Sequence, residues 1–365
     1  MPAEPTFILP AEWEPQDAIW LSWPVSTHIW PEFRAEIEPA FAQLAAQFSY
    51  FEPVKINADG RAHAKIREHL NRARADLSVI ELYDHPTDDV WCRDHGAVFV
   101  RDAATGKLAA TDWRFNAWGG KFTPFDRDDE AAVRMADALG VPCHRSELIL
   151  EGGAIESNGA GVLLTTEEVL LNPNRNPEWS KADVEAELRR LLGVKEIFWL
   201  PRGLDHDDTD GHIDNMTRFI GENAVITAVD PREITPRVVP QPWLEEARLR
   251  LKERFETVLE LPLPEPYLSV GGKGAASATS DGGRAPMSAS GGTPPRPASY
   301  LNYALVNDAV IVPAFGQPKN DDFARGVLAD CFPDRKAVSF DCRLFLEEGG
   351  AVHCLSQHQG KALDP

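Results

Sequence analysis

A glycine-flanked cysteine near the C-terminus is the first candidate for chemistry. Gly349 and Gly350 precede Cys354, and a short run typical of a buried strand follows it. Because glycine has no Cβ, the backbone there can approach a ligand closely, and a thiol at the end of such a loop is placed as a nucleophile would be. Free cysteines are also among the most buried residue types and usually only pack. Taken alone, the stretch favours a packed cysteine.

Three further polar clusters precede this loop at regular spacing. The first contains Asp94, the second Glu151, and the third His212 and Asp214. Glu151 lies 57 residues after Asp94, and His212 lies 61 residues after Glu151. If a structural unit is repeated around an axis, equivalent loops meet at one end of that axis. The spacing therefore predicts one pocket that holds carboxylates, a histidine and Cys354.

Such a pocket suits a guanidinium group. Carboxylates only accept hydrogen bonds and guanidinium presents its N–H groups in a planar fork, so Asp94 and Asp214 could each hold two N–H groups. The indole faces of nearby tryptophans would stack favourably on the delocalised cation. The candidates are Trp91, Trp113 and Trp118, although buried tryptophans are more often core residues.

The same residue types can cleave a C–N bond of that group. A Cys354 thiolate could attack the guanidinium carbon, and His212 could protonate the departing ammonia and then activate water against the covalent thiouronium intermediate. The surrounding carboxylates would raise the pKa of the thiol. The thiolate therefore depends on the imidazolium or on the substrate cation for its stabilisation.

The same clusters are also compatible with different roles. Residues 205–210 are typical of a solvated acidic turn, and Arg93 could form a structural ion pair with Asp94. Carboxylates combined with imidazoles suit Mn, Fe or Zn, so a metal-dependent hydrolase is a second hypothesis. Its candidate ligands are His206, Asp208, His212 and Asp214.

A weak internal repeat supplies elements that could position these residues. Val98, Val162 and Val225 each lie in a short apolar run, and they are 64 and 63 residues apart. A helical pattern and a second apolar run follow most of these runs. The expected unit is strand, helix, strand, repeated about five times with a period of roughly 60 to 70 residues, which is typical of radial or solenoid repetition. Ordinary α/β alternation could produce part of this pattern.

The expected elements have the following bounds. First strands are expected at residues 18–22, 97–100, 161–165, 224–227 and 309–313. Helices are expected at residues 31–47, 128–139, 181–192, 243–256 and 321–328, and second strands at 53–56, 77–80, 148–150, 196–200 and 337–340. The helix at 181–192 has the clearest ends, because Ser180 and Asp183 form a capping pattern and Gly193 follows the last turn.

Composition limits the class of protein. With 365 residues, 43% hydrophobic and 26% charged, the chain allows one large domain or two ordinary ones. A net charge of −20 argues against nucleic acid or an anionic membrane surface as a partner and suits a cationic small molecule. No apolar run reaches the length of a transmembrane helix, and the first residues lack a signal-peptide pattern. Five widely spaced cysteines fit a reducing cytosol, so a cytoplasmic protein is expected.

One segment departs from the repeat. Residues 271–299 are rich in Gly, Ala, Ser and Pro and contain almost no apolar side chains. Such a composition cannot bury enough surface to offset its ordering entropy. We therefore expect a mobile surface loop inserted in the last unit, and not a boundary between domains.

The clusters, read together, resemble the agmatine deiminase family, to which the bacterial-type peptidylarginine deiminases belong. The strings that carry the resemblance are Trp91-x-Arg93-Asp94-x-Gly96, residues 113–120, Leu150-Glu151-Gly152-Gly153, residues 163–177, residues 208–215 and Gly349-Gly350-x-x-His353-Cys354. The similarity runs from Glu12 to Cys354 in the family's order. It implies an α+β fold, the α/β-propeller (pentein) of five ββαβ units around a pseudo-fivefold axis, with residues 1–365 as one catalytic domain.

The resemblance also implies roles for the site residues and no metal or organic cofactor. The implied roles are nucleophile for Cys354, general acid/base for His212, guanidinium ligands for Asp94 and Asp214, acidic partner of the histidine for Glu151, and walls of the substrate site for Trp91 and Trp118.

The expected reaction is the hydrolysis of agmatine to N-carbamoylputrescine and ammonia. Deimination of arginine, peptidyl-arginine or another guanidine is the sister hypothesis, and a propeller that binds cations without catalysis is a further one. The family usually reads Gly-Gly-Gly-Asn-Ile-His-Cys before the nucleophile, whereas this chain has Glu348 in place of the first glycine and Ala351 in place of the asparagine. A homo-oligomer is one of the assemblies that the sequence allows.

Overall fold

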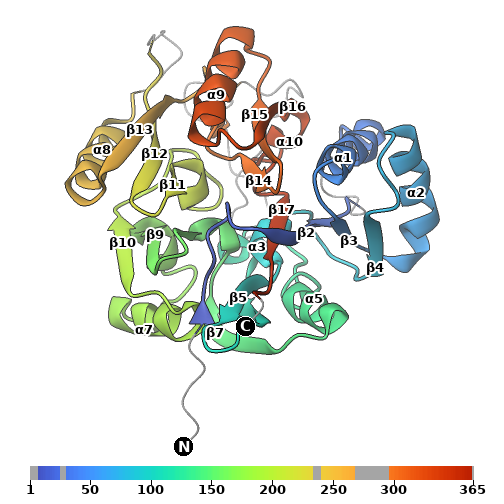
Figure 1. The fold of residues 1–365 in the computed structure, drawn as a ribbon, viewed down its shortest axis with the longest axis horizontal. Helices are drawn as coiled ribbons and strands as arrows, with labels where there is room; N and C mark the ends of the chain where they lie inside the picture. Colours follow the sequence, from blue (N-terminus) through green and yellow to red (C-terminus); the bar gives the residue numbers. More distant parts are fainter. Residues whose placement is uncertain (1–6, 25–29, 233–239, 268–295, 364–365) are drawn as a thin grey trace, which may run out of the picture.

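The strands form five small sheets in the part of the chain that the structure describes. The computed structural model describes residues 7–24, 30–232, 240–267 and 296–363. Figure 1 shows the sheets and their helices arranged around the middle of the molecule, in chain order. Each sheet contains two antiparallel strands, then a helix, then a strand parallel to the second strand. The expected strand–helix–strand unit is confirmed, and it carries an additional first strand.

Four of the sheets are built from consecutive segments. The first has β5 (Val98–Asp102), β6 (Leu108–Arg114), α5 (Ala131–Leu139) and β7 (Cys143–Ile149), with β1 (Phe7–Ile8) on its edge. The second has β8 (Glu156–Ser157), β9 (Val162–Thr166), α7 (Lys181–Leu192) and β10 (Glu196–Leu200). The third has β11 (Thr217–Gly221), β12 (Ala224–Val229), α8 (Pro242–Arg254) and β13 (Thr257–Pro262), and the fourth has β14 (Ala304–Val306), β15 (Ala309–Ala314), α9 (Pro318–Cys331) and β16 (Lys336–Asp341).

The fifth sheet joins the two ends of the chain. The C-terminal strand β17 (Ser356–Gly360) pairs antiparallel with β2 (Gln16–Ser22), with Ser356 opposite Leu21. The sheet continues through α1 (Arg34–Ser49), β3 (Val54–Ala58), α2 (His63–Arg72) and β4 (Ile80–Asp84). Cys354 lies two residues before β17, so pairing with the N-terminal strand fixes the segment that carries the thiol.

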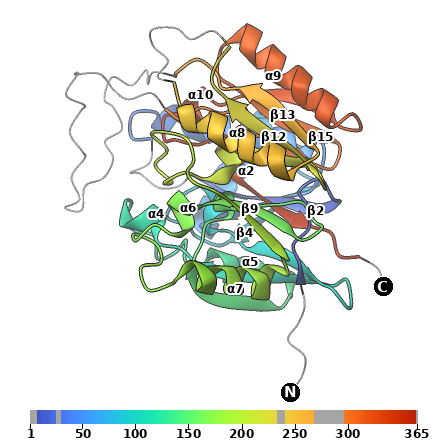
Figure 2. The ribbon, with the colours of Figure 1, turned by 90° about the vertical axis from the view of Figure 1, so that its left-hand side faces the viewer.

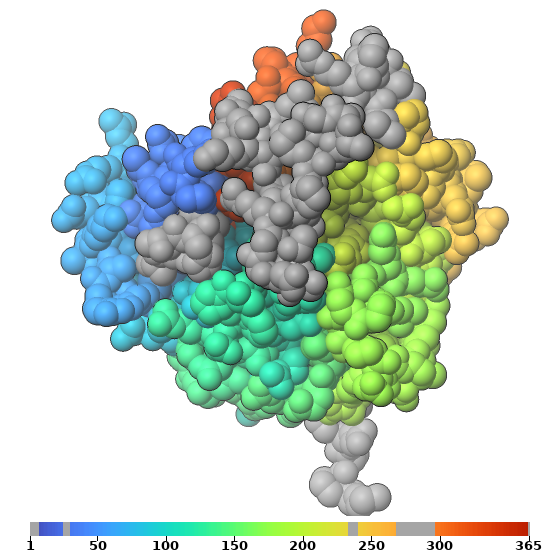
Figure 3. Space-filling model, turned by 180° about the vertical axis from the view of Figure 1, so that it is seen from behind, coloured from blue at the N-terminus to red at the C-terminus, as the bar shows by residue number. Residues whose placement is uncertain are grey.

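Helices lie outside the strands. Figures 1 and 2 show α7, α8 and α9 on the periphery of the molecule. On the face seen in Figure 3, the blue residues of the fifth sheet and the yellow residues of the third lie at opposite sides. Helix α7 has the predicted ends, because the Ser180 side chain accepts from the backbone N–H of Asp183 and the Asp183 side chain accepts from that of Ser180, a capping box. Gly193 ends the helix with a φ of 67°.

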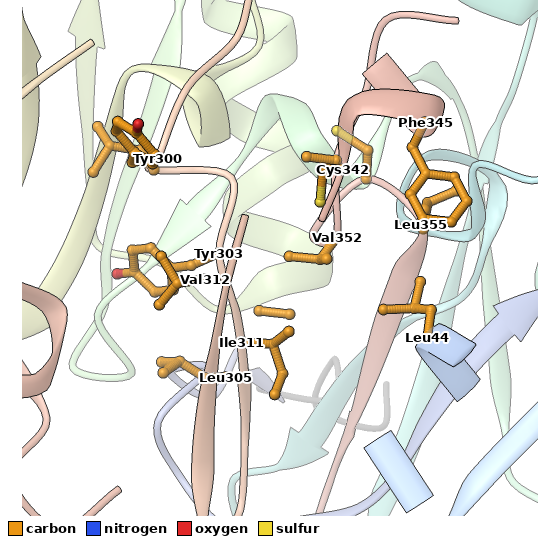
Figure 4. Packing of buried hydrophobic residues seen from close by; sticks show 14 of the residues in the cluster. Leu44, Tyr300, Tyr303, Leu305, Ile311, Val312, Cys342, Phe345, Val352 and Leu355 are labelled. Carbon is orange, nitrogen blue, oxygen red and sulfur yellow. The ribbon is translucent and has the colours of Figure 1, made fainter. Parts of the chain in front are cut away.

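Apolar side chains between the sheets hold the cysteine-bearing segment in place. Val352 and Leu355, on either side of Cys354, are completely buried. Figure 4 shows Leu355 beside Phe345 and Val352 on the side of Cys342, and both belong to one apolar cluster. Removing an isoleucine- or leucine-sized side chain from such a layer costs about 2–5 kcal/mol. The position of Cys354 is therefore determined by packing from several sheets.

The structure corrects the register of the expected repeat. Val162, Val225 and Val310 lie on β9, β12 and β15, each the central strand of its sheet, but Val98 lies on β5, which pairs with β1 and β6. The equivalent central strand is β6, in whose seven residues Thr111 is the one β-branched side chain. The strand expected at residues 77–80 begins only at Ile80. Helix α2 and strand β13 were not expected at all.

The expected insert at residues 271–299 lies mostly outside the described residues. Residues 271–295 lie outside the described residues, but residues 296–299 are placed. Arg296 pairs with Tyr267 in an antiparallel bridge, and the buried Ser299 donates its hydroxyl to the carbonyl of Asn215 at 2.7 Å. Tyr267 and Arg296, the residues on either side of the segment that is not described, are therefore adjacent in space. In the described part of the chain, no helix has both the length and the apolarity needed to cross a bilayer.

Candidate active site

Equivalent connections of the fold carry the candidate residues. In each case the chain passes from the last strand of one sheet to the first strand of the next. Asp94 lies between β4 and β5, Glu151 between β7 and β8, His212 and Asp214 between β10 and β11, and Cys354 between β16 and β17. The contacts described below bring these residues close to one another.

His212 lies between two carboxylates. Its Nε2 is 3.4 Å from Oε2 of Glu151, and its Nδ1 is 3.7 Å from Oδ1 of Asp94. Gly153 leaves room for this arrangement, because a Cβ at that position would come within 2.5 Å of Nδ1 of His212 and 3.1 Å of Oδ2 of Asp214. The backbone N–H of Gly153 donates to Oδ1 of Asp94 at 3.1 Å. The histidine and both aspartates therefore surround one small space.

The thiol of Cys354 borders the same group of residues. Its Sγ lies 3.8 Å from Oδ2 of Asp214 and accepts a hydrogen bond from the side-chain amide of Asn302 at 3.0 Å. Oδ2 of Asp214 also accepts from Nδ1 of His353 at 2.7 Å. The cysteine, His212 and both aspartates are all buried. These four residues therefore form a buried cluster, whereas residues 205–210, expected as an acidic turn, are half-buried or exposed.

Two buried polar atoms of this cluster have no hydrogen-bond partner among the described residues. They are Nδ1 of His212 and Oδ1 of Asp214. Because an unpaired buried donor or acceptor costs about 1–3 kcal/mol, such atoms mark positions where a ligand can bind. One donor and one acceptor, next to a thiol, are what a guanidinium and its leaving nitrogen require.

The electrostatics separate the protonation states of His212 and Asp94. Burial opposes a charge on His212, but Asp94 and Glu151 outweigh it and raise the pKa of the imidazole to about 9. Burial raises the pKa of Asp94 to about 6, and the nearby Asp214 adds to this while His212 opposes it. At neutral pH the histidine is thus a cation beside an ionised aspartate.

Glu151 and Asp214 are ionised, whereas the thiol of Cys354 is protonated. Burial disfavours the charge of Glu151, but Arg175 and His212 hold its pKa below the usual value. Burial acts in the same way on Asp214, and the hydrogen bond from His353 outweighs it and lowers the pKa. For Cys354, burial and then the charges of Asp214 and Asp94 raise the pKa of the thiol well above its usual range.

The expected tryptophans occupy different positions. Trp118 donates its indole N–H to Oδ2 of Asp94 at 3.0 Å, and its φ of 55° is a strained backbone conformation for a bulky residue. Trp91 packs so closely against the nucleophile loop that a Cβ on Gly350 would come within 2.3 Å of its ring. Trp113 instead belongs to a separate apolar cluster and donates to Oγ1 of Thr111.

The structure supports neither the ion pair between Arg93 and Asp94 nor the four-residue metal site. Arg93 faces Oε2 of Glu12 at 3.6 Å and Nδ1 of His358 at 3.0 Å, and the described contacts show no ion pair with Asp94. The candidate metal ligands His206, Asp208, His212 and Asp214 do not form one of the groups of three or more metal-ligating side chains found among the described residues. His206 itself is exposed.

One such group does occur in the described chain, and a cation already occupies it. Glu12, Glu156 and His353 lie close enough together to share an ion. The guanidinium of Arg218 donates to Glu12 and to Glu156, at 2.9 Å each. Its charge and that of Arg93, which lies 3.6 Å from Glu12, offset these two carboxylates, so the group forms a buried ion network and not a metal site.

Comparison with known proteins places this geometry in a family. The family model described as Porphyromonas-type peptidyl-arginine deiminase matches residues 8–360. The chain belongs to this family. The agmatine deiminase of Stutzerimonas stutzeri is 36% identical over 369 residues, which cover 98% of this chain and 96% of that protein. The resemblance expected from the sequence is confirmed.

Solved structures agree with the family assignment. The agmatine deiminase of Enterococcus faecalis, described as catalysing its reaction, has a TM-score of 0.85 at 30% identity and covers 98% of this chain and 97% of its own. A cysteine-to-serine variant of C. jejuni agmatine deiminase with substrate bound has a TM-score of 0.82 at 29% identity, with coverage of 98% and 97%.

Sequence reasoning did not identify Arg175 and His353, which hold the site residues in position. Arg175 donates to Oε1 of Glu151 and to Oδ2 of Asp210, at 2.7 Å each. His353 bridges Asp214 and Glu12, with its Nε2 2.8 Å from Oε2 of Glu12. In the sequence both residues are only members of longer motifs. Their roles could not be predicted because their partners are distant in the chain.

Proposed function

We propose that this protein is a guanidine deiminase that hydrolyses agmatine to N-carbamoylputrescine and ammonia. One observation carries the proposal: the unpartnered Nδ1 of His212 and Oδ1 of Asp214 belong to the buried cluster that contains Cys354. A proton donor, an anionic acceptor and a nucleophile are the groups that this reaction needs. The names of the family's agmatine deiminases support the choice of substrate.

The carboxylates bind and orient the substrate. Asp94 and Asp214 accept hydrogen bonds from the guanidinium nitrogens, which places the planar cation beside the sulfur. Trp91 and Trp118 form walls of the site, and the indole N–H of Trp118 keeps Asp94 in position. Substrate binding brings a positive charge next to Cys354, and this charge lowers the pKa of a thiol that the empty site keeps protonated.

The first chemical step forms a C–S bond and breaks a C–N bond. The sulfur of Cys354 attacks the guanidinium carbon, while the leaving nitrogen takes the thiol proton and the Nδ1 proton of His212 and departs as ammonium. The product is a cationic thiouronium on Cys354, with His212 now neutral. Glu151 remains ionised and holds Nε2 of the ring, which keeps Nδ1 directed into the site.

The second step consumes water. Neutral His212 accepts one proton from the water as its oxygen bonds to the thiouronium carbon, and the second proton returns to the sulfur as the C–S bond breaks. The carbamoyl product leaves, and both the thiol and the imidazolium are restored. Charges and protons balance over the cycle: a guanidinium and water become a ureido group and ammonium.

The fold and context belong to the same proposal. We infer that the five ββαβ sheets form a five-bladed α/β propeller and that the whole chain is one catalytic domain, whose last strand β17 is paired with β2. We also infer a cytoplasmic protein, in keeping with its five free cysteines, of which Cys354 is the nucleophile.

A side-by-side ammonia assay tests the substrate. Agmatine carries two positive charges and no carboxylate, whereas arginine carries a carboxylate that the net charge of −20 disfavours. We expect kcat/KM for agmatine to exceed that for free arginine and for a blocked peptidyl-arginine by about 100-fold or more. Release of ammonia is measured with each compound at equal concentration.

Each alternative gives a different result in this assay. Preference for peptidyl-arginine would reassign the substrate within the family. Loss of activity with a chelator, together with normal activity of Cys354→Ala, would replace the mechanism with a metal-dependent one. No ammonia from any guanidine would leave only a cation-binding role.

The pH profile tests the two assigned protonation states. Below about pH 6 Asp94 becomes protonated and loses its attraction for the cation, and above about pH 9 His212 loses the proton that the leaving nitrogen needs. We therefore expect kcat/KM for agmatine to rise through about pH 6 and to fall through about pH 9.

The two limbs can be assigned with a variant. Glu151→Gln removes a negative charge that raises the pKa of His212 and also that of Asp94, so the alkaline limb should move to lower pH and the acid limb should shift in the same direction. A profile that stays flat from about pH 5 to about pH 10 would contradict both assignments.

A further inference from the structure

Asn302 occupies the one equivalent connection that sequence reasoning left without a functional residue. It lies between β13 and β14, where the other connections between sheets carry Asp94, Glu151, His212 and Cys354. Asn302 is completely buried. Each of these connections thus contributes a polar side chain to one cluster. Asn302 is the side chain contributed by the connection between the third and the fourth sheet.

The orientation of its side-chain amide follows from its contacts. Oδ1 accepts the backbone N–H groups of His353 at 3.1 Å and Cys354 at 3.3 Å, so Nδ2 must be the other atom. Nδ2 lies 3.0 Å from Sγ of Cys354 and 3.0 Å from Oδ1 of Asn215. Its two N–H bonds therefore point at these two acceptors, with Oδ2 of Asp214 further away at 3.3 Å.

We propose that Asn302 is a catalytic residue, which donates a hydrogen bond to the sulfur of Cys354 and stabilises its thiolate. The proposal deepens the deiminase function proposed above and rests on Cys354 being the nucleophile.

A neutral donor is needed at this sulfur because its surroundings are acidic. Burial and the charges of Asp214 and Asp94 raise the pKa of the thiol, and the hydrogen bond from Asn302 is one of the contacts that oppose the rise. A fixed donor aimed at a developing charge in a buried site acts much more strongly than in water. Among the described contacts, Asn302 is the side-chain amide that donates to Sγ of Cys354.

The segment around Asn302 is built to hold it rigidly. The hydroxyl of Ser299 accepts the backbone N–H of Leu301 at 3.2 Å and donates to the carbonyl of Asn215 at 2.7 Å. Asn215 in turn accepts from Nδ2 of Asn302. Because these contacts fix both the backbone and the amide plane, the donor is positioned before the thiolate forms.

The test measures the thiol directly. Wild type, Asn302→Ala and Asn302→Ser are treated with iodoacetamide over a range of pH, and alkylation of Cys354 is followed by peptide mass mapping, which separates it from the other four cysteines. Serine keeps a neutral polar group but is too short to reach the sulfur. We expect the midpoint of alkylation to rise by about one pH unit or more in both variants.

Turnover supplies a second readout. With agmatine, kcat should fall by about 100-fold while KM changes by less than about threefold, since the donor contacts the sulfur and not the substrate. Asn307→Ala is the matched control, because this amide bonds only the backbone of Gln16 among its described contacts. It should lower the melting temperature and leave the alkylation midpoint unchanged.

The outcomes separate the two proposals. An alkylation midpoint equal to that of wild type in both folded Asn302 variants overturns the role of Asn302. If Asn302→Ala does not fold, the serine variant decides. The alkylation needs no substrate, so a wild-type protein that releases no ammonia from any guanidine would refute the deiminase function and leave the thiolate measurement standing.

Discussion

Replacing Cys354 with serine is expected to lower kcat for agmatine by about 10⁵-fold, which is the size of effect that loss of a catalytic nucleophile produces. A serine hydroxyl has a far higher pKa than a thiol, so the acidic surroundings that already raise the pKa of Cys354 would keep the hydroxyl neutral. Substrate binding should stay within a few-fold of wild type, because Asp94 and Asp214 keep their charges. The measurements are steady-state ammonia release and calorimetric titration with agmatine.

A second cysteine provides the control for this variant. Cys331 lies at the end of α9 and is half-buried, with no contact to the site among the described residues. Cys331→Ala should therefore keep kcat within about twofold of wild type. Normal turnover by Cys354→Ser, or loss of binding without a change in kcat, would remove Cys354 from the role of nucleophile.

The sequence made the site residues predictable because each lies in a short contiguous string. Asp94, Glu151 and His212 each lie within two residues of a glycine at similar spacing, and a spacing that recurs in each unit needs no knowledge of three-dimensional contacts. Helix α7 was predictable for the same reason, since its cap and its stop signal are local. Local signals of this kind carry over directly from sequence to structure.

Contacts between distant segments could not be predicted in this way. Asn302 stands in the run Tyr300-Leu301-Asn302-Tyr303, where a single amide among apolar residues resembles part of a strand. Its distance to Cys354 depends on how the fourth sheet packs against β17, which no local pattern encodes. The signal that could have revealed it was the empty place in the series of equivalent connections.

Strand β6 shows a second limit of sequence reasoning. Its residues are mostly small or polar, and it lies in the centre of its sheet only because β5 and β7 pair with it on both sides. Neighbouring strands can place a weak strand former in a sheet, because packing outweighs intrinsic preference. The shift in the expected repeat at Val98 follows from this.

The ionisation states also connect the sites of binding and catalysis. In the empty site Cys354 is a thiol, His212 is a cation and Asp214 is an anion. The thiolate becomes favourable only when a guanidinium binds next to it. The nucleophile is thus activated by its own substrate.

Replacing His212 with glutamine is expected to lower kcat by about 10³-fold, within the range that a general acid/base contributes. Glutamine can still hydrogen bond to Glu151, but it has no proton to give to the leaving nitrogen and cannot take one from water. Because water attack on the thiouronium then lacks its base, an adduct with the mass of agmatine minus ammonia should accumulate on Cys354. Acid quenching followed by peptide mass mapping detects it.

His206→Gln is the matched control, since His206 lies six residues away in the same acidic segment but is exposed. It should retain kcat within about twofold and show no accumulated adduct. An adduct on any other cysteine would assign the nucleophile elsewhere. Equal losses in the His206 and His212 variants would instead point to the metal hypothesis, because a metal site would need both imidazoles, whereas the deiminase mechanism needs only the one whose Nδ1 is left unpaired in the buried cluster.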